Sequence, residues 1–159
     1  MVRMVDIGHK EAVPRMARAS GLIRLKAETL KKIEAREVPK GDVLAVAQTA
    51  AIMAVKRTTE LIPLTHPIPI TGVDVDLKIE ENGVRAEVEV RSLGKTGVEM
   101  EALAGVIGAL LSVWDMVKGL EKDEAGQYQT TCLEDIRVVK KVKGWVSKST
   151  GKKRRKSSG

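Results

Sequence analysis

The chain has 159 residues, a length that suits one domain built around one hydrophobic core. It carries 28 basic and 21 acidic residues for a net charge of +7, and only 2% of it is aromatic, with no phenylalanine. Such a chain builds an aliphatic core, and its few aromatic residues are too scattered in sequence to form the stacking platforms that bind single-stranded nucleic acid.

The positive charge gathers at the C-terminal end. Residues 146–159 hold six lysines and arginines and no acid, and without them 22 basic residues face 21 acidic ones. This composition predicts a disordered basic tail over 146–159 that follows a single domain over 1–145. A solvated appendage and a weak contact to polyanions both remain open for the tail.

Cysteine content and hydropathy indicate the compartment. Cys132 is the only cysteine, so no disulfide within the chain is expected. No apolar run reaches the roughly 20 residues that span a bilayer, and the first residues lack the apolar region of a signal peptide. We therefore expect a cytoplasmic protein without membrane contact.

The first half of the chain predicts a strand followed by helices. Residues 13–25 have extended character, and 27–36 have the spacing of a short helix. Asp42 follows a Pro-Lys-Gly break and is placed to cap an alanine-rich helix over 43–59. The segment LIPLTHPIPI over 61–70 contains three prolines and is expected to be a stiff connector.

The second half predicts a hairpin, a long helix and a last strand. Apolar and charged residues alternate over 73–80 and again over 84–91, with Glu-Asn-Gly between them, as in a β-hairpin with one buried face. A helix is predicted from 98 to about 121 and a strand over 133–142. The apolar stripe of the long helix is expected to comprise Leu103, Val106, Ile107, Leu110, Leu111, Trp114 and Val117.

This order of elements predicts an α+β fold of the ferredoxin-like type. It consists of an antiparallel sheet with helices packed on one face. Enzymes, RNA-binding modules and small-molecule sensors all use this fold, so function has to be argued from particular residues.

The long helix carries the strongest candidates for chemistry. Glu99 and Glu101 lie in its first turn, where the helix dipole favours carboxylates and capping alone explains them. Asp115 and Lys118 are three residues apart near its other end and can form an ordinary ion pair. At the edge of an apolar stripe the pair would instead be partly desolvated, which brings pKa values toward the range of acid–base catalysis.

Other candidates are weaker. His66 lies in the proline-rich connector, where a lone histidine is commonly structural, and two histidines with one cysteine do not have metal-ligand spacing, so no metal site is expected. Neither common glycine-rich phosphate loop is present. A phosphate site would use dispersed basic residues such as Arg18, Lys40 and Lys56.

Three segments resemble one family of enzymes. The strings KGDVLAVAQTAAIMAVKRTTELIPLTHPI and RSLGKTGVEMEALAGVIGALLSVWDMVK, with the opening MVDI, are similar to the cyclic pyranopterin monophosphate synthases, also called molybdenum cofactor biosynthesis protein C. The resemblance runs from about residue 4 to residue 123. It implies a ferredoxin-like fold, a homohexamer built as a trimer of dimers, and active sites at subunit interfaces.

The resemblance also implies the reaction and the residues that perform it. The expected substrate is a guanosine-derived triphosphate, 3′,8-cyclo-7,8-dihydroguanosine 5′-triphosphate, which is converted to cyclic pyranopterin monophosphate with release of pyrophosphate, a lyase reaction. Asp115 and Lys118 match the catalytic pair. The positions that match the substrate pocket are Leu64, Thr65, His66, Met100, Glu101, Glu99, Lys56, Lys40 and, with the loosest match, Arg18. No cofactor is implied, and a divalent ion with the triphosphate is allowed but not required.

The chain departs from the family pattern in three places. Thr65 stands where the family commonly has cysteine, the segment EAGQYQTTCLEDI over 124–136 is longer than usual, and the glycine-rich C-terminal signature is replaced by KVKGWVSKSTGKKRRK. Two other kinds of protein remain open. A nucleotide or pterin sensor would keep the pocket without turnover, and an RNA-binding module would need aromatic residues on its sheet, where the hairpin has charged ones.

Overall fold

The structure is a computed structural model that describes residues 1–144. The basic tail predicted over 146–159 lies outside the described residues. The division into a domain and a tail therefore stays a prediction.

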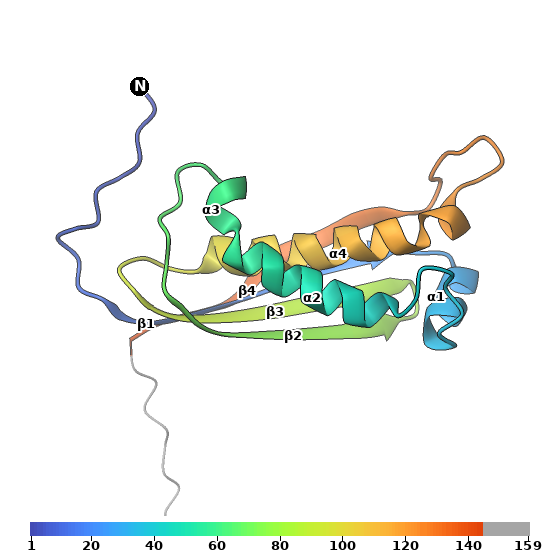
Figure 1. Ribbon diagram of the computed structural model, residues 1–159, viewed down its shortest axis with the longest axis horizontal. Coiled ribbons are helices and arrows are strands. Elements are labelled where there is room, and N and C mark those ends of the chain that lie inside the picture. Colours follow the sequence, from blue (N-terminus) through green and yellow to red (C-terminus); the bar gives the residue numbers. More distant parts are fainter. Residues whose placement is uncertain (145–159) are drawn as a thin grey trace, which may run out of the picture.

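Four long antiparallel strands form one sheet (Figure 1). They lie in the order β2-β3-β1-β4, so that the first and third strands in sequence occupy the centre of the sheet. Their bounds are β1 Val13–Arg24, β2 Ile70–Glu80, β3 Gly83–Gly94 and β4 Cys132–Lys143. The pairings β1 with β3, β1 with β4 and β2 with β3 are all antiparallel.

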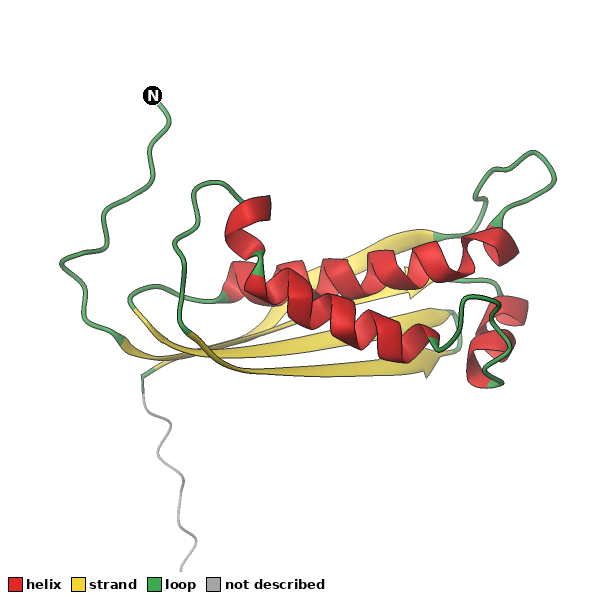
Figure 2. Ribbon diagram, in the orientation of Figure 1, coloured by secondary structure: helices red, strands yellow, loops and turns green. Residues whose placement is uncertain are grey.

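Helices cover one face of this sheet and leave the other open (Figure 2). The bounds are α1 Ala27–Glu34, α2 Val43–Lys56, α3 Thr58–Leu61 and α4 Glu99–Glu121. The two long helices α2 and α4 run side by side over the sheet (Figure 1). This arrangement confirms the predicted α+β, ferredoxin-like fold.

The predicted hairpin is confirmed, and its two strands differ in burial. Val84, Ala86, Val88 and Val90 of β3 are fully buried beneath the helices. The alternating residues of β2 are half-buried or exposed, because β2 is an edge strand and α2 covers it only in part. The turn falls at Glu81 and Asn82 as expected.

Two details of the helices were predicted wrongly. The helix expected over 43–59 ends at Lys56, because Arg57 leaves helical geometry with φ −114° and ψ 19°, and α3 begins after it. Leu111, assigned to the apolar stripe of α4, is 53% exposed. The buried side of α4 instead includes Ala102, Ala109 and Val113, since its contacts are with α2 on one side and the sheet on the other.

Small residues bring α2 and α4 into close contact. A Cβ atom added at Gly108 would lie 2.7 Å from Ala54 Cβ and 3.2 Å from the carbonyl oxygen of Ala50. A Cβ atom added at Gly105 would lie 2.9 Å from methyl groups of both Val55 and Val88. The crossing therefore requires glycine at both positions.

Length and composition alone would also allow α4 to span a membrane. Its mean hydropathy over the most apolar window is 1.6, but 56% of that window is buried inside the fold. The helix is apolar because it is the central helix of the core.

Two glycines of α4 provide a matched test of this packing. Gly108→Ala and Gly119→Ala each gain the higher helix propensity of alanine, about 1 kcal/mol. An added Cβ meets nothing within 4 Å at Gly119 but collides with α2 at Gly108. We expect Gly119→Ala to stabilise the chain and Gly108→Ala to lower its free energy of unfolding by about 1–3 kcal/mol relative to that control. Chemical denaturation measures both values, and equal effects would contradict a tight helix crossing.

Candidate active site

A cavity of about 520 Å³ lies where the proline-rich connector meets the start of α4. Six residues predicted for the substrate pocket line it together, although two segments more than thirty residues apart supply them. They are Leu64, Thr65, His66, Glu99, Met100 and Glu101. Thr96, Gly97, Ile68 and Val138 of β4 complete the wall. The fold thus places the two most family-specific segments of the sequence in one site.

Local hydrogen bonds hold the connector in place. The backbone N–H of Ile62 donates to the Thr58 carbonyl at 2.8 Å and ends α3. Thr65 turns the chain, since its N–H and its hydroxyl both donate to the Ile62 carbonyl, at 3.2 Å and 2.7 Å. The prolines on either side of Leu64–His66 stiffen this turn, so the cavity wall is preformed.

The pKa values of the two glutamates in the cavity shift in opposite directions. Glu101 is only 4% exposed, and burial raises the pKa of its carboxyl, with a further contribution from the negative charge of Glu99. Burial acts in the same direction on Glu99, but the Lys141 ammonium hydrogen-bonds to it and its pKa is lowered. The Glu101 carboxyl is therefore protonated more readily than that of Glu99.

A second cavity, of about 540 Å³, adjoins the first and is basic. The two share Thr96, Gly97 and Glu99. Its wall contains His9, Lys10, Arg15, Lys141 and Lys143, with Glu11 and Glu99 as the acids. Arg15 is held from behind, donating to the carbonyl oxygens of Gly94 at 3.0 Å and Lys95 at 3.3 Å.

Sequence reasoning missed this basic cavity. Arg15 and Lys141 come from opposite ends of the chain and meet because β1 and β4 pair. No local pattern marks either residue. The signal lay only in the topology, since the start of β1 and the end of β4 fall at the same end of a ferredoxin-like sheet.

Lys56 lies beside the first cavity. It lines a small space of about 90 Å³ together with Glu101, Ile68 and Pro67. Because Glu101 and Ile68 also line the larger cavity, Lys56 lies next to that cavity without lining it.

Asp115, Lys118 and Lys40 form a separate cluster near the C-terminal end of α4. Lys118 Nζ lies 2.9 Å from Asp115 Oδ1, and Lys40 Nζ lies 2.8 Å from Asp115 Oδ2. Lys40 also donates to the Asp115 carbonyl at 2.8 Å. The hydrogen bonds from Lys118, then from Lys40, lower the Asp115 pKa to about 2, and Asp115 raises the pKa of Lys118.

In the single chain, Asp115 and Lys118 form a largely exposed ion pair. The side chains of Asp115 and Lys118 are 59% and 46% exposed. Their pKa values move apart because the two groups stabilise each other's charge in water. Of the two alternatives that the sequence left open, the single chain therefore has the ordinary ion pair.

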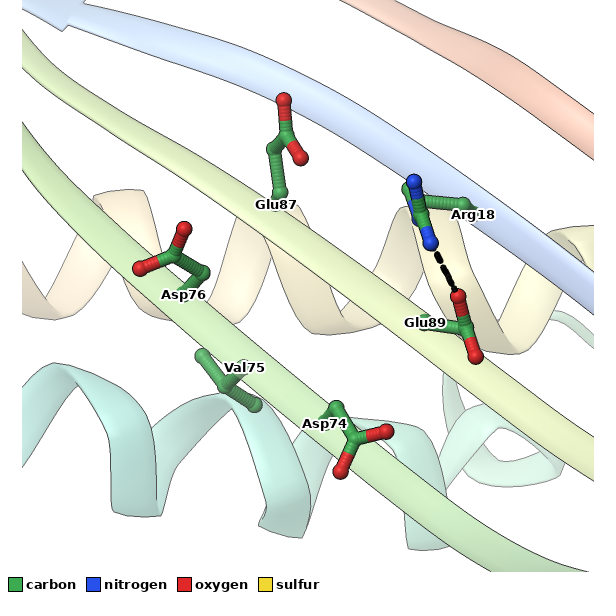
Figure 3. A pocket seen from close by; sticks show the side chains of 6 residues that line it. All are labelled: Arg18, Asp74, Val75, Asp76, Glu87 and Glu89. Atoms are coloured by element: carbon green, nitrogen blue, oxygen red, sulfur yellow. Dashed lines mark hydrogen bonds and ion pairs between the residues drawn. The ribbon is translucent and has the colours of Figure 1, made fainter.

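Arg18 lies apart from both groups. It is on the open face of the sheet, in a cavity of about 410 Å³ lined mostly by acids: Asp74, Asp76, Glu87 and Glu89 (Figure 3). Its guanidinium donates to Glu89 at 2.5 Å. Within one chain, the structure does not bring Arg18 to the cavity that contains His66 and Glu101.

The length of α4 separates the two main groups of candidates. An α-helix rises about 1.5 Å per residue, so roughly 20 Å of helix lies between Glu101 and Asp115. Over residues 1–144, no three His, Cys, Asp or Glu side chains are grouped so that they would hold a metal ion. The expectation of a reaction without metal or cofactor stays a prediction.

Known proteins resemble the chain over almost all of the described part. A model of the MoaC family matches residues 4–144. Proteins described as probable cyclic pyranopterin monophosphate synthases are 59% identical in Thermococcus kodakarensis and 61% identical in Methanosarcina mazei, over 143 and 142 residues. The aligned region covers 90% of this chain and 92% of the first relative, and 89% and 90% for the second. A relative in Archaeoglobus fulgidus is 59% identical over 143 residues.

The ion pairs of Asp115 predict how far its pKa should rise when each lysine partner is removed. In the single chain, Asp115 should stay ionised until the pH falls to about 2, and Lys118→Met should move its pKa up toward 3.8, its ordinary value. Lys40→Met should raise it by less, because the Lys118 hydrogen bond has the larger effect. Carbon-13 NMR of the Asp115 carboxyl measures all three, with the exposed Lys122→Met as control. No shift in Lys118→Met would contradict the pairing.

Proposed function

The chain belongs to the MoaC family, and on that premise we propose how its two groups of site residues share one reaction. It is a lyase of molybdenum cofactor biosynthesis that forms cyclic pyranopterin monophosphate. Its substrate is 3′,8-cyclo-7,8-dihydroguanosine 5′-triphosphate, and the second product is pyrophosphate. The observation that carries the proposal is the convergence of Leu64–His66 and Glu99–Glu101 on one preformed cavity.

The guanine-derived ring occupies the cavity at the start of α4. Glu101 is buried there and accepts hydrogen bonds from ring N–H groups, which a carboxyl in either protonation state can do. Met100 and Leu64 supply apolar contact, and His66 faces the same space. Lys56 lies beside Glu101 and orients its carboxyl or meets the first phosphate.

The triphosphate extends into the adjoining basic cavity. Arg15, Lys10, Lys141 and Lys143 offset its negative charge and that of the departing pyrophosphate. Arg15 is fixed by two carbonyl oxygens, so its donors are oriented before the ligand arrives. Glu99 holds Lys141 at the border between the two cavities.

Asp115 and Lys118 carry the proton transfers. A substrate hydroxyl attacks the innermost phosphorus, the bond from that phosphorus to the bridging oxygen breaks, and the hydroxyl proton passes to the Asp115 carboxylate. Lys118 is the ammonium that donates to nitrogen or carbon as the rings rearrange. Their pKa directions support this division, because Asp115 is ionised and Lys118 protonated at neutral pH.

The reaction needs both groups at one substrate, so the active site combines two chains. About 20 Å of rigid helix keeps Asp115 from reaching the cavity of its own chain. A neighbouring subunit supplies Asp115, Lys118 and Lys40 to the cavity that lies at the start of α4 in the first subunit. We propose that the chain assembles as a homohexamer, a trimer of dimers, and that it works in the cytoplasm.

The reaction itself is tested by incubating the purified chain with the cyclised guanosine triphosphate. We expect stoichiometric pyrophosphate and cyclic phosphate product. Lys118→Ala should lose nearly all turnover while keeping its thermal transition, because it lacks the proton donor. Tight binding of the triphosphate without release of pyrophosphate would indicate a sensor and overturn the proposal.

The shared site predicts complementation between two inactive variants. Glu101→Ala lacks the carboxyl that binds the ring and Asp115→Asn lacks the proton acceptor, so each alone should be inactive. Mixed by co-refolding, they should regain about a quarter of parental activity, because random pairing yields one intact site in each mixed dimer. Asp115→Asn mixed with Lys118→Ala is the matched control and should stay inactive, since both changes affect the same half-site. Inactivity of the first mixture would place the whole site within one chain.

A further inference from the structure

The segment between α4 and β4, residues 122–131, delivers an aromatic ring to the catalytic turn of α4. Tyr128 packs edge-on against Trp114, with ring centroids 5.2 Å apart and planes at 73°. Trp114 directly precedes Asp115. The segment projects at the end of the molecule opposite α3 (Figure 1).

The fold of this segment is specified by its own hydrogen bonds. The Asp123 carboxylate accepts from the backbone N–H of Gln127 at 2.8 Å and from the side-chain amide of Gln129 at 3.0 Å. The backbone groups of Asp123 close the loop with Gln127 and with Gly126, both at 2.9 Å. Gly126 adopts a φ of +76°, which favours glycine. Tyr128 therefore stands on a structured loop.

A buried carboxylate anchors both ends of the loop to the fold. Glu121 is fully buried at the end of α4, where the helix dipole opposes a negative charge. It accepts from the Thr131 hydroxyl at 2.6 Å and from the backbone N–H of Lys26 at 3.1 Å. The Glu121 carboxylate thus links the end of α4, the start of α1 and the segment that leads into β4.

The ring also lies among the charges of this turn. Lys122 Nζ is 6.0 Å from the centre of the Tyr128 ring. Asp115 raises the pKa of Lys118 through a hydrogen bond and its negative charge, burial lowers it, and Tyr128 makes a smaller contribution that raises it. Among the described residues, Trp114 and Tyr128 form the one aromatic pair, and it lies beside the exposed Asp115–Lys118 pair.

We propose that Tyr128 is a positioning residue for Asp115 and Lys118. Its ring holds Trp114 in place and limits the motion of the turn that carries the pair, so that both groups meet the substrate in one geometry. Small displacements of catalytic groups are costly, and a 1 Å misplacement can slow a reaction about 100-fold. This inference rests on the proposed function, because it assigns Tyr128 a role through the catalytic pair.

Kinetics of Tyr128 variants test the role. We expect Tyr128→Phe to keep kcat within about twofold, since the ring remains, and Tyr128→Ala to lower kcat about tenfold or more with KM little changed. Tyr128→Leu, which keeps bulk near Trp114, should fall between them. Ile33→Ala, a core change in α1, is the control for general destabilisation. Parental kcat in Tyr128→Ala, or a loss no larger than that of Ile33→Ala at equal thermal stability, would overturn the proposal.

A second measurement is independent of turnover. If Tyr128 restrains the pair, Tyr128→Ala should loosen the Lys118 contact and raise the pKa of Asp115 from about 2 toward its ordinary value, while Tyr128→Phe should leave it unchanged. An unchanged Asp115 titration in Tyr128→Ala would overturn the positioning role even in an active enzyme. Absence of pyrophosphate release by the parent chain, with the expected shift in the titration, would instead count against the proposed function alone.

Discussion

The contact between α2 and α4 fixes the rest of the structure. Gly108 brings α4 against Ala50 and Ala54, and Gly105 lets it settle on Val55 and Val88 at the same crossing. A side chain at either position would push the helices apart or lift α4 from the sheet. Because α4 is held this closely, its two ends have fixed positions relative to the connector, to α1 and to β4. Each group of functional residues depends on one of those ends.

The two ends of α4 suit different tasks. The first turn carries buried Glu101 and partly buried Glu99 beside a basic cavity, where the positive end of the helix dipole helps to keep carboxylates inside the protein. The last turns carry Lys118, a cation favoured by the negative end of the dipole, together with Asp115. One end lines a cavity and the other carries an exposed ion pair. In the proposed function, neither is a complete site by itself.

The sequence predicted the local elements well, because their signals are local. Alternation marked the hairpin, and Asp42 caps α2 through a 3.0 Å bond to the Ala45 N–H as expected. What depends on tertiary packing was missed: the break at Arg57, the exposure of Leu111 and the burial of Glu121 as an anchor. The resemblance brought together Leu64–His66 and Glu99–Glu101, which line one cavity. The resemblance did not single out Arg15, Lys141 or Tyr128, whose positions follow from strand pairing and from a long loop.

The exposed Asp115–Lys118 pair explains why assembly would matter for the chemistry. Acid–base catalysis works best when pKa values lie near the operating pH, yet in the single chain the pKa of Asp115 is about 2 and that of Lys118 is raised. Covering the pair with a second chain removes water, which disfavours both charges and shifts the two pKa values back toward each other. In the proposed assembly, a second chain over the pair would therefore unite two half-sites and also bring Asp115 as the base and Lys118 as the acid closer to the working pH.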